Sequence, residues 1–199
     1  MPEFFPLSRP MGVADLIMKC CLECLCMNFV DLNPAKVISM SKDADRDWSK
    51  HPPHVVVDGN CWLYECSYYL ARGLALGNTY EAGFTSFKDR FMKRVDYVKQ
   101  RGFKITVVFD GRRLRAKRST DAKRREAREK NAKKAAELEQ AGQGDTSAAH
   151  DAYNKSFVVT NKLIHAMFEE LKNKGVAVFI APHEGDAQCA WFAHHYYAR

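Results

Sequence analysis

No segment of this 199-residue sequence is apolar over the roughly 18 residues that a membrane-spanning helix requires. The first residues also lack the pattern of a secretory signal peptide, because the acid Glu3 comes early and the apolar stretch after it is broken. From these absences we predict no membrane partner and no secretory leader.

The cysteines lack the spacing of a structural site. There are seven of them, an odd number, and four are crowded into the segment from Cys20 to Cys26. That arrangement is not a spaced disulfide framework, and no matching Cys/His pair follows at zinc-finger spacing. We therefore expect reduced thiols in an intracellular protein.

Positive charge is abundant and concentrated in one segment. The chain has a formal net charge of +7, yet twelve lysines and arginines against three acids between Arg112 and Lys134 give that segment alone an excess of +9. A pI near 9.0 makes a polyanion the first partner to consider. Composition alone leaves a second possibility open, a charged helix that is merely solvated.

The hydrophobic pattern predicts an α/β fold, with a parallel sheet flanked by helices and a projecting basic helix. Short apolar runs at 55–57, 103–109 and 176–180 are typical of buried strands, and helical patterns cover 61–76, 79–100, the basic segment to about 141, 147–174 and 187–197. The basic helix has almost no apolar stripe, so we expect it to extend into solvent. We expect the apolar face of the helix at 79–100 to be core rather than a base-stacking surface; it consists of Phe84, Phe87, Phe91, Val95 and Val98.

Each predicted strand is followed by acid. Asp58 and Asp110 end the first two, and Glu184 and Asp186 come shortly after the third. Because parallel strands present their carboxyl ends at the same edge of a sheet, these side chains should converge there. Clustered carboxylates without histidine or cysteine favour a hard divalent ion, Mg²⁺ or Mn²⁺. The alternative is that each acid only caps the helix that follows it.

Carboxylates that bind metal, placed beside a cationic helix, suit phosphodiester hydrolysis. Two metal ions can activate water and stabilise the leaving oxygen, while the cations contact phosphate.

These residues resemble the 5′-nuclease superfamily of flap endonuclease, exonuclease 1 and the XPG repair nuclease, and are most similar to exonuclease 1. The resemblance rests on VDGNCWLY at 57–64, VFDG at 108–111 and APHEGDAQ at 181–188, in matching order and spacing over about 54–199. MGVADL at 11–16 is similar to the family's start.

The resemblance implies that Asp58, Asp110, Glu184 and Asp186 bind the catalytic Mg²⁺ ions, with Mn²⁺ as a possible substitute. It implies that Lys117 and Arg124, at the foot of a helical arch covering about 112–145, are catalytic residues that contact the scissile phosphate. Further DNA contacts are implied for Gly12 near the start, for Tyr64 as a base-stacking aromatic, and for the basic residues Arg112, Arg113, Arg115, Arg118, Lys123, Arg125 and Arg128.

Two departures from the family pattern affect what the resemblance implies. Residues 1–53 remain poorly assigned, with 17–50 a possible insertion, and 54–199 correspond to the N-terminal part of the nuclease domain. The family also has a paired-Asp motif after the next strand and a helix-two-turn-helix that grips duplex DNA. Neither occurs in these 199 residues, so the incomplete 176–199 region implies a partial two-metal site.

We therefore expect a nuclear DNA-repair enzyme, a Mg²⁺-dependent 5′→3′ exonuclease and flap endonuclease acting on DNA with 5′ ends or 5′ flaps. Two alternatives stay open. One is a catalytically incomplete DNA-binding fragment of such a nuclease, and the other is a PIN-like ribonuclease, which would share the acid-ended strands without needing the long cationic helix.

Overall fold

The computed structural model describes residues 52, 54–68, 70–76 and 80–196, with the side chains of 80–83 and 193–196 excepted. Within this part, β1 (His54–Asp58), β2 (Lys104–Phe109) and β3 (Ala177–Ile180) form one parallel sheet in the order β1-β2-β3. The helical elements are α3 (Gly59–Ser67), α4 (Ala71–Ala75), α5 (Tyr80–Gln100), the 3-10 turn η2 (Arg115–Lys117), α6 (Arg118–Gln140), α7 (Ser147–Ser156), α8 (Asn161–Asn173) and α9 (Gly185–Tyr196). The predicted α/β class with a parallel sheet is confirmed.

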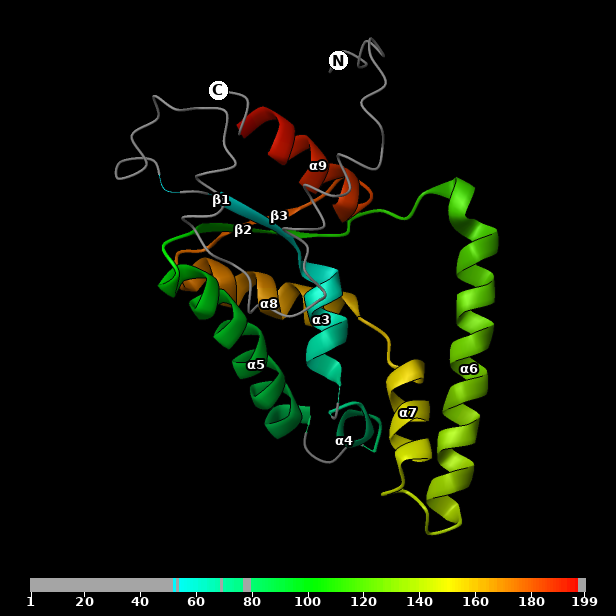
Figure 1. Cartoon of the computed structure of the whole chain (residues 1–199). Helices are drawn as coiled ribbons and strands as arrows, with labels where there is room; N and C mark the ends of the chain where they lie inside the picture. Colours follow the sequence, from blue (N-terminus) through cyan, green and yellow to red (C-terminus); the bar gives the residue numbers. More distant parts are fainter. Residues whose placement is uncertain (1–51, 53, 69, 77–79, 197–199) are drawn as a thin grey trace.

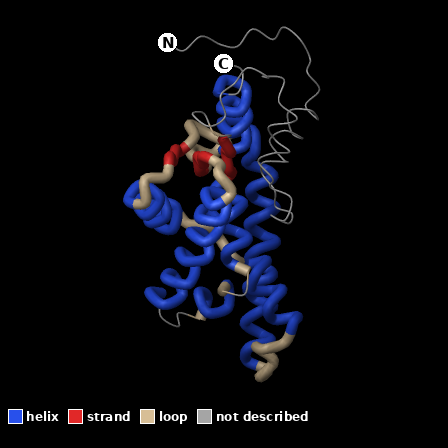
Figure 2. The backbone as a smooth tube through the Cα atoms, turned by 60° about the vertical axis from the view of Figure 1, so that its left-hand side comes forward, coloured by secondary structure: helices blue, strands red, loops and turns tan. Residues whose placement is uncertain are grey.

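Helices cover both faces of the sheet. Figure 1 shows α3, α5 and α8 on one face and α9 on the other, and Figure 2 shows the strands gathered near one end of a mostly helical molecule. Neighbouring strands taken in chain order, joined by right-handed crossovers, place their connecting helices on a single face. Side chains alternate accordingly: Val55 and Val57 lie in the main core, whereas Val56 packs with Cys189 and Phe192 of α9.

The main core is formed by α5 against β1 and β2. Phe87, Phe91, Val95 and Val98 are fully buried at helical spacing, which confirms that this face is core rather than a base-stacking surface. Burying each such side chain stabilises the fold by about 2 kcal/mol. The central strand β2 is buried along both faces from Ile105 to Phe109, as its continuous apolar run predicted.

Two helices predicted as continuous are each divided in two. The predicted helix at 61–76 ends at Tyr68, where the backbone becomes extended and the carbonyl accepts a 2.6 Å hydrogen bond from Arg90 Nη1. The predicted helix at 147–174 is interrupted at 157–160, a stretch with two adjacent valines followed by Thr160, which caps α8 by accepting from Leu163 N at 3.2 Å. Because β-branched residues lose rotamer freedom in a helix, interrupting the helix at the valines costs little free energy. The break also lets Phe157 pack on the core.

The basic helix α6, which we expected to extend into solvent, is exposed along most of its length, but its C-terminal part packs against other helices, which we did not expect. Ala135 is fully buried in a small cluster with Ala71, Ala152 and Tyr153, contributed by α4 and α7. Alanine gives almost no apolar stripe, yet its small side chain allows α6 and α7 to approach closely.

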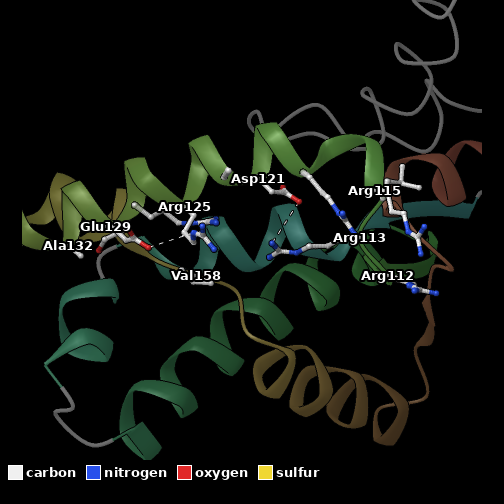
Figure 3. Close-up of a pocket in the computed structure, with 13 residues that line it drawn as sticks. Arg112, Arg113, Arg115, Asp121, Arg125, Glu129, Ala132 and Val158 are labelled. Carbon is white, nitrogen blue, oxygen red and sulfur yellow. Dashed lines mark ion pairs between the residues drawn. The ribbon is translucent and has the colours of Figure 1, made fainter.

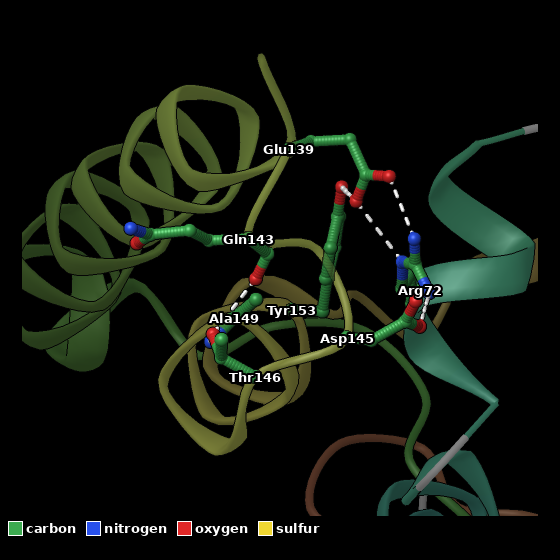
Figure 4. A network of polar contacts seen from close by, with 7 residues as sticks. All are labelled: Arg72, Glu139, Gln143, Asp145, Thr146, Ala149 and Tyr153. Atoms are coloured by element: carbon green, nitrogen blue, oxygen red, sulfur yellow. Dashed lines mark hydrogen bonds and ion pairs between the residues drawn. The ribbon is translucent and has the colours of Figure 1, made fainter. Parts of the chain in front are cut away.

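An ion-pair cluster joins the same end of α6 to α4. Arg72 donates to both carboxylate oxygens of Glu139, at 3.0 and 2.7 Å, and also contacts Asp145, while the Tyr153 hydroxyl donates to Glu139 at 3.1 Å (Figure 4). Hydrogen bonds from Arg72 lower the pKa of Glu139. A Cβ on Gly144 would lie 2.3 Å from the Glu139 carboxylate, so a larger residue there would require the side chains of this ion-pair cluster to shift.

Candidate metal and nucleic-acid site

Asp58 is the last residue of β1 and the N-cap of α3. Its Oδ1 accepts from the backbone N–H groups of Asn60 and Cys61 at 2.8 and 3.2 Å, and the Cys61 thiol donates to Oδ2 at 3.2 Å. Only 6% of the residue is exposed. Burial raises the pKa of the Asp58 carboxyl to about 6, and the charges of Asp186 and Asp110 act in the same direction. The capping role that we considered as an alternative is therefore real here, and it coexists with crowding by other acids.

Asp110 follows β2 directly and does not cap the element that comes next in the chain, because the N-cap of η2 is Leu114. Its two carboxylate oxygens accept hydrogen bonds at 2.7 Å, one from the Asn60 amide and one from the backbone N–H of Gly185. Burial raises the pKa of the Asp110 carboxyl, and Glu184 and Asp186 raise it further.

The chain segments that leave β2 and β3 are held against each other, which brings Glu184 beside Asp110. Gly111 N donates to His183 O at 2.7 Å and Arg112 N donates to Pro182 O at 3.1 Å. A Cβ on Gly111 would lie 1.7 Å from the carbonyl oxygen of Ala181, so only glycine fits. The short β3 thus delivers its acids to the same edge of the sheet as β1 and β2.

Lys117 in η2 lies at this acidic edge. Its Nζ donates to Glu184 Oε2 at 2.6 Å, and this hydrogen bond raises the pKa of the lysine; nearby Arg124 acts in the opposite direction. The two predicted catalytic cations are therefore within electrostatic range of each other, and Lys117 is within range of Glu184, Asp186 and Asp110.

The donor chemistry of these acids fits a divalent ion, but the cage is not formed. Asp58, Asp110, Glu184 and Asp186 offer oxygen ligands, and a cation among them would relieve the repulsion by which neighbouring acids help to raise the pKa values of Asp58 and Asp110. Within the described residues, however, no group of three or more His, Cys, Asp or Glu side chains is arranged so that it could hold a metal ion as it stands. The assignment of these four residues as metal ligands stays a prediction.

All six predicted DNA-binding arginines line one groove of about 910 Å³ along the sheet-proximal part of α6 (Figure 3). The arginines that line it are Arg112, Arg113, Arg115, Arg118, Arg125 and Arg128. Asp121 and Glu129 also line it, 3.9 Å from Arg113 and 3.8 Å from Arg125 respectively, so the groove keeps a net positive charge. Lys117, Lys123 and Arg124 are not among its lining residues.

The opposite wall of this groove includes Ser156, the last residue of α7, and Val158, from the connection between α7 and α8. Sequence reasoning missed both, because it treated this connection as helix. Tyr64 lies nearby in the fold: it is 43% exposed, and its ring meets Phe157 edge to face at 6.1 Å between centroids. It is exposed enough to contact a ligand, and its predicted stacking role stays a prediction. Gly12 lies outside the described residues.

Asn60 was also missed. Asn60 lies in the first turn of α3, two residues after Asp58. Because Asp58 already caps this helix, the helix does not need an asparagine there, and this was the only, weak sign in the sequence that Asn60 has another role.

The fold and site define a parallel α/β protein whose acid-ended strands lie next to a basic helical arm. Residues 38–131 match the family described as the XPG N-terminal domain. The chain is similar to exonuclease 1 of Danio rerio (32% identity over 137 residues, 69% of this chain and 16% of that protein) and of Arabidopsis thaliana (32% over 143 residues, 70% and 18%). It is also similar to flap endonuclease 1 of Cryptosporidium muris (32% over 139 residues, 68% and 29%).

These similarities support a relationship to the 5′-nuclease superfamily, and the relatives named are nucleases. The aligned region spans less than a third of the length of each of these three relatives. No helix among the described residues is long and apolar enough to cross a membrane.

Proposed function

We propose that this chain forms the N-terminal part of a Mg²⁺-dependent, structure-selective DNA nuclease that acts in nuclear DNA repair. Its substrates would be DNA with 5′ ends or 5′ flaps, and its reaction the hydrolysis of phosphodiester bonds by 5′→3′ exonuclease and flap endonuclease activity. The observation that carries the proposal is the meeting of Asp58, Asp110 and Glu184, from three strand ends, with Lys117 at the foot of α6.

In this proposal the acids and the cations have different tasks. Asp58, Asp110, Glu184 and Asp186 would hold divalent ions, Mg²⁺ or Mn²⁺, which activate water and stabilise the leaving oxygen. Lys117 and Arg124 would contact the scissile phosphate, where positive charge stabilises the charge that develops during hydrolysis.

The arginine groove would bind the backbone of the DNA strand. Guanidinium groups donate in a planar fork that matches phosphate oxygens, and six of them line one groove. Binding should weaken steeply with salt, because each phosphate that the protein neutralises releases condensed counterions. Tyr64, which is exposed beside Phe157, would stack on a base of the bound strand.

One observation favours a second candidate function, a DNA-binding fragment without catalysis. The described acids do not form a ready metal cage, so this chain would then bind flap DNA without cleaving it.

The test is cleavage of a labelled 5′-flap DNA by the 199-residue chain in Mg²⁺ and in EDTA, with a matched RNA flap alongside. We expect Mg²⁺-dependent cleavage of DNA that Asp110→Ala abolishes. Asp151→Ala, which removes an exposed acid paired with Lys155 on α7, is the matched control and should cleave normally.

The other outcomes discriminate between the candidates. Salt-dependent binding of the DNA flap without cleavage in Mg²⁺ would establish the non-catalytic fragment. Preferential cleavage of RNA would favour a PIN-like ribonuclease, and cleavage by Asp110→Ala would remove Asp110 from the proposed metal site.

A further inference from the structure

Asn60 makes two hydrogen bonds with the same residue, Asp110. Its side-chain Nδ2 donates to Asp110 Oδ2 at 2.7 Å, and its Oδ1 accepts from the Asp110 backbone N–H at 3.2 Å. Asp110 is fifty residues away in sequence, so these two hydrogen bonds join the start of α3 to the end of β2.

The pair of bonds determines how the amide is oriented. The Asp110 backbone N–H can only donate, so it must face the amide oxygen, which leaves the amide NH₂ toward the carboxylate. A side chain in this place needs a donor and an acceptor at fixed separation. Aspartate would lack the donor, and leucine, of similar size, would lack both.

Strand register explains why these two residues meet. Asp58 is paired with Val108 in the parallel ladder of β1 and β2. Asn60 and Asp110 each lie two residues beyond that pair, so they are level at the edge of the sheet where the chain leaves both strands. The same turn of α3 presents the backbone N–H groups that bind Asp58, and one short segment therefore contacts two of the four acids.

The second oxygen of Asp110 is held from the opposite side. Gly185 N donates to Oδ1 at 2.7 Å, and a Cβ on Gly185 would approach that oxygen to 3.0 Å. The carboxylate is thus held between neutral donors from α3 and α9. A carboxylate has about four lone-pair directions, and these two bonds leave the others available.

We propose that Asn60 is a positioning residue, which fixes the orientation of the Asp110 carboxylate so that its remaining lone pairs face the other acids. The consequence for a bound ion rests on the proposed function, whereas the orientation of Asp110 does not. A residue with only a structural role in α3 would leave the orientation of Asp110 unchanged when it is replaced.

The first measurement uses the metal-free chain in EDTA. Nuclear magnetic resonance couplings that report the χ1 angle of Asp110 should show one rotamer in the wild type and averaging among rotamers in Asn60→Leu and Asn60→Ala. The leucine variant keeps the volume and the alanine variant avoids a bulky apolar group, so agreement between them isolates the effect of removing the two hydrogen bonds. A single Asp110 rotamer in both variants, or averaging already in the wild type, overturns the proposal.

The second measurement is the dissociation constant for Mg²⁺ alone, by calorimetric titration with MgCl₂. Loss of a group that orients a metal ligand typically weakens metal binding about 10–100-fold, and we expect that range for both Asn60 variants. Asn131→Ala is the matched control, because that asparagine donates only to Ala127 O in its own exposed helix at 2.7 Å. It should bind Mg²⁺ as the wild type does.

The two measurements can fail separately. If the wild type binds no Mg²⁺, the proposed function fails for this chain, while the rotamer result still decides the role of Asn60. If the wild type binds Mg²⁺ and Asn60→Leu binds it equally well, positioning by Asn60 does not matter to the ion and the proposal is overturned.

Discussion

The acidic edge of the sheet and the basic helix α6 carry opposite charge and are held in opposite ways. The carboxylates of Asp58 and Asp110 accept hydrogen bonds from backbone and side-chain donors, and burial raises the pKa of each. Along α6 only Ala135 is buried, and the cations are mostly exposed. Charges held in a buried position act strongly at short range, whereas exposed charges are screened and act by their number.

The same contrast recurs within α6. Its sheet-proximal part lines the arginine groove, and its far end packs on α4 and α7 through Ala135 and the Arg72–Glu139 pair. One end of the helix thus packs against the rest of the protein, while the other end lines the groove with its arginines.

The largest expected effect tests whether cations near the acids differ from cations farther along α6. In a chain with flap cleavage activity, Lys117→Ala and Arg124→Ala should each lower kcat by about 100-fold, since each removes a charge that the proposed function puts beside the scissile phosphate. Lys133→Ala/Lys134→Ala should leave kcat nearly unchanged. It should instead weaken binding and lower the slope of log K against log salt by about 0.9 for each phosphate that the protein no longer neutralises. If substitutions at all four positions lowered kcat equally, cations near the acids would not differ in role from cations farther along α6.

The next effect concerns the cost of burying Asp58. Its pKa of about 6 lies about two units above the ordinary value of 3.8, which corresponds to roughly 3 kcal/mol. The native state binds the proton more tightly than the unfolded state, so stability from this group is complete below about pH 4 and is lost as pH rises through about 6.

Asp58→Asn should remove this pH dependence and keep the helix cap, because asparagine also accepts at an N-cap. We would measure the free energy of unfolding by denaturant in EDTA from pH 4 to pH 7. As the pH rises over this range, that free energy should increase by roughly 3 kcal/mol in the variant relative to the wild type. If the difference between the two free energies of unfolding stayed constant over this pH range, burial would not raise the pKa of Asp58.

A pair of glycines tests the close approach that brings Glu184 to Asp110. Gly111→Ala should destabilise the chain by about 1–3 kcal/mol, because the new Cβ would meet the carbonyl oxygen of Ala181. Gly73→Ala is the control: nothing lies within 4 Å of a Cβ there, and alanine should stabilise α4 by about 0.5–1 kcal/mol. Thermal unfolding measures both, and a neutral Gly111→Ala would contradict the close approach.

The smallest expected effect tests how the far end of α6 is fastened. Arg72→Met should speed hydrogen exchange in the C-terminal turns of α6 and in α7, since Glu139 and Asp145 lose their shared partner. Lys155→Met, which breaks an exposed ion pair within α7, should change exchange little. Equal exchange in the two variants would show that Arg72 does not hold α6.

Much of the fold and part of the site could be predicted from the sequence, because the relevant patterns are local. The apolar face of α5 and the buried run of β2 have clear periods, and the acids stand at strand ends. The helix breaks at Tyr68 and at 157–160 were missed because helical periodicity continues across both. The packing of α6 was missed because an alanine contact leaves no hydrophobic stripe.

By itself, the sequence determined the parallel α/β class, the concentration of positive charge in one helix and the presence of an acid after each strand. Only the tertiary structure decided that Asn60 holds Asp110, that Gly111 admits the Ala181 carbonyl, and that Ser156 and Val158 face the arginines. Each of these contacts joins segments that are distant in the chain. Their existence depends on strand register and on where helices end, which no local pattern of residue types records.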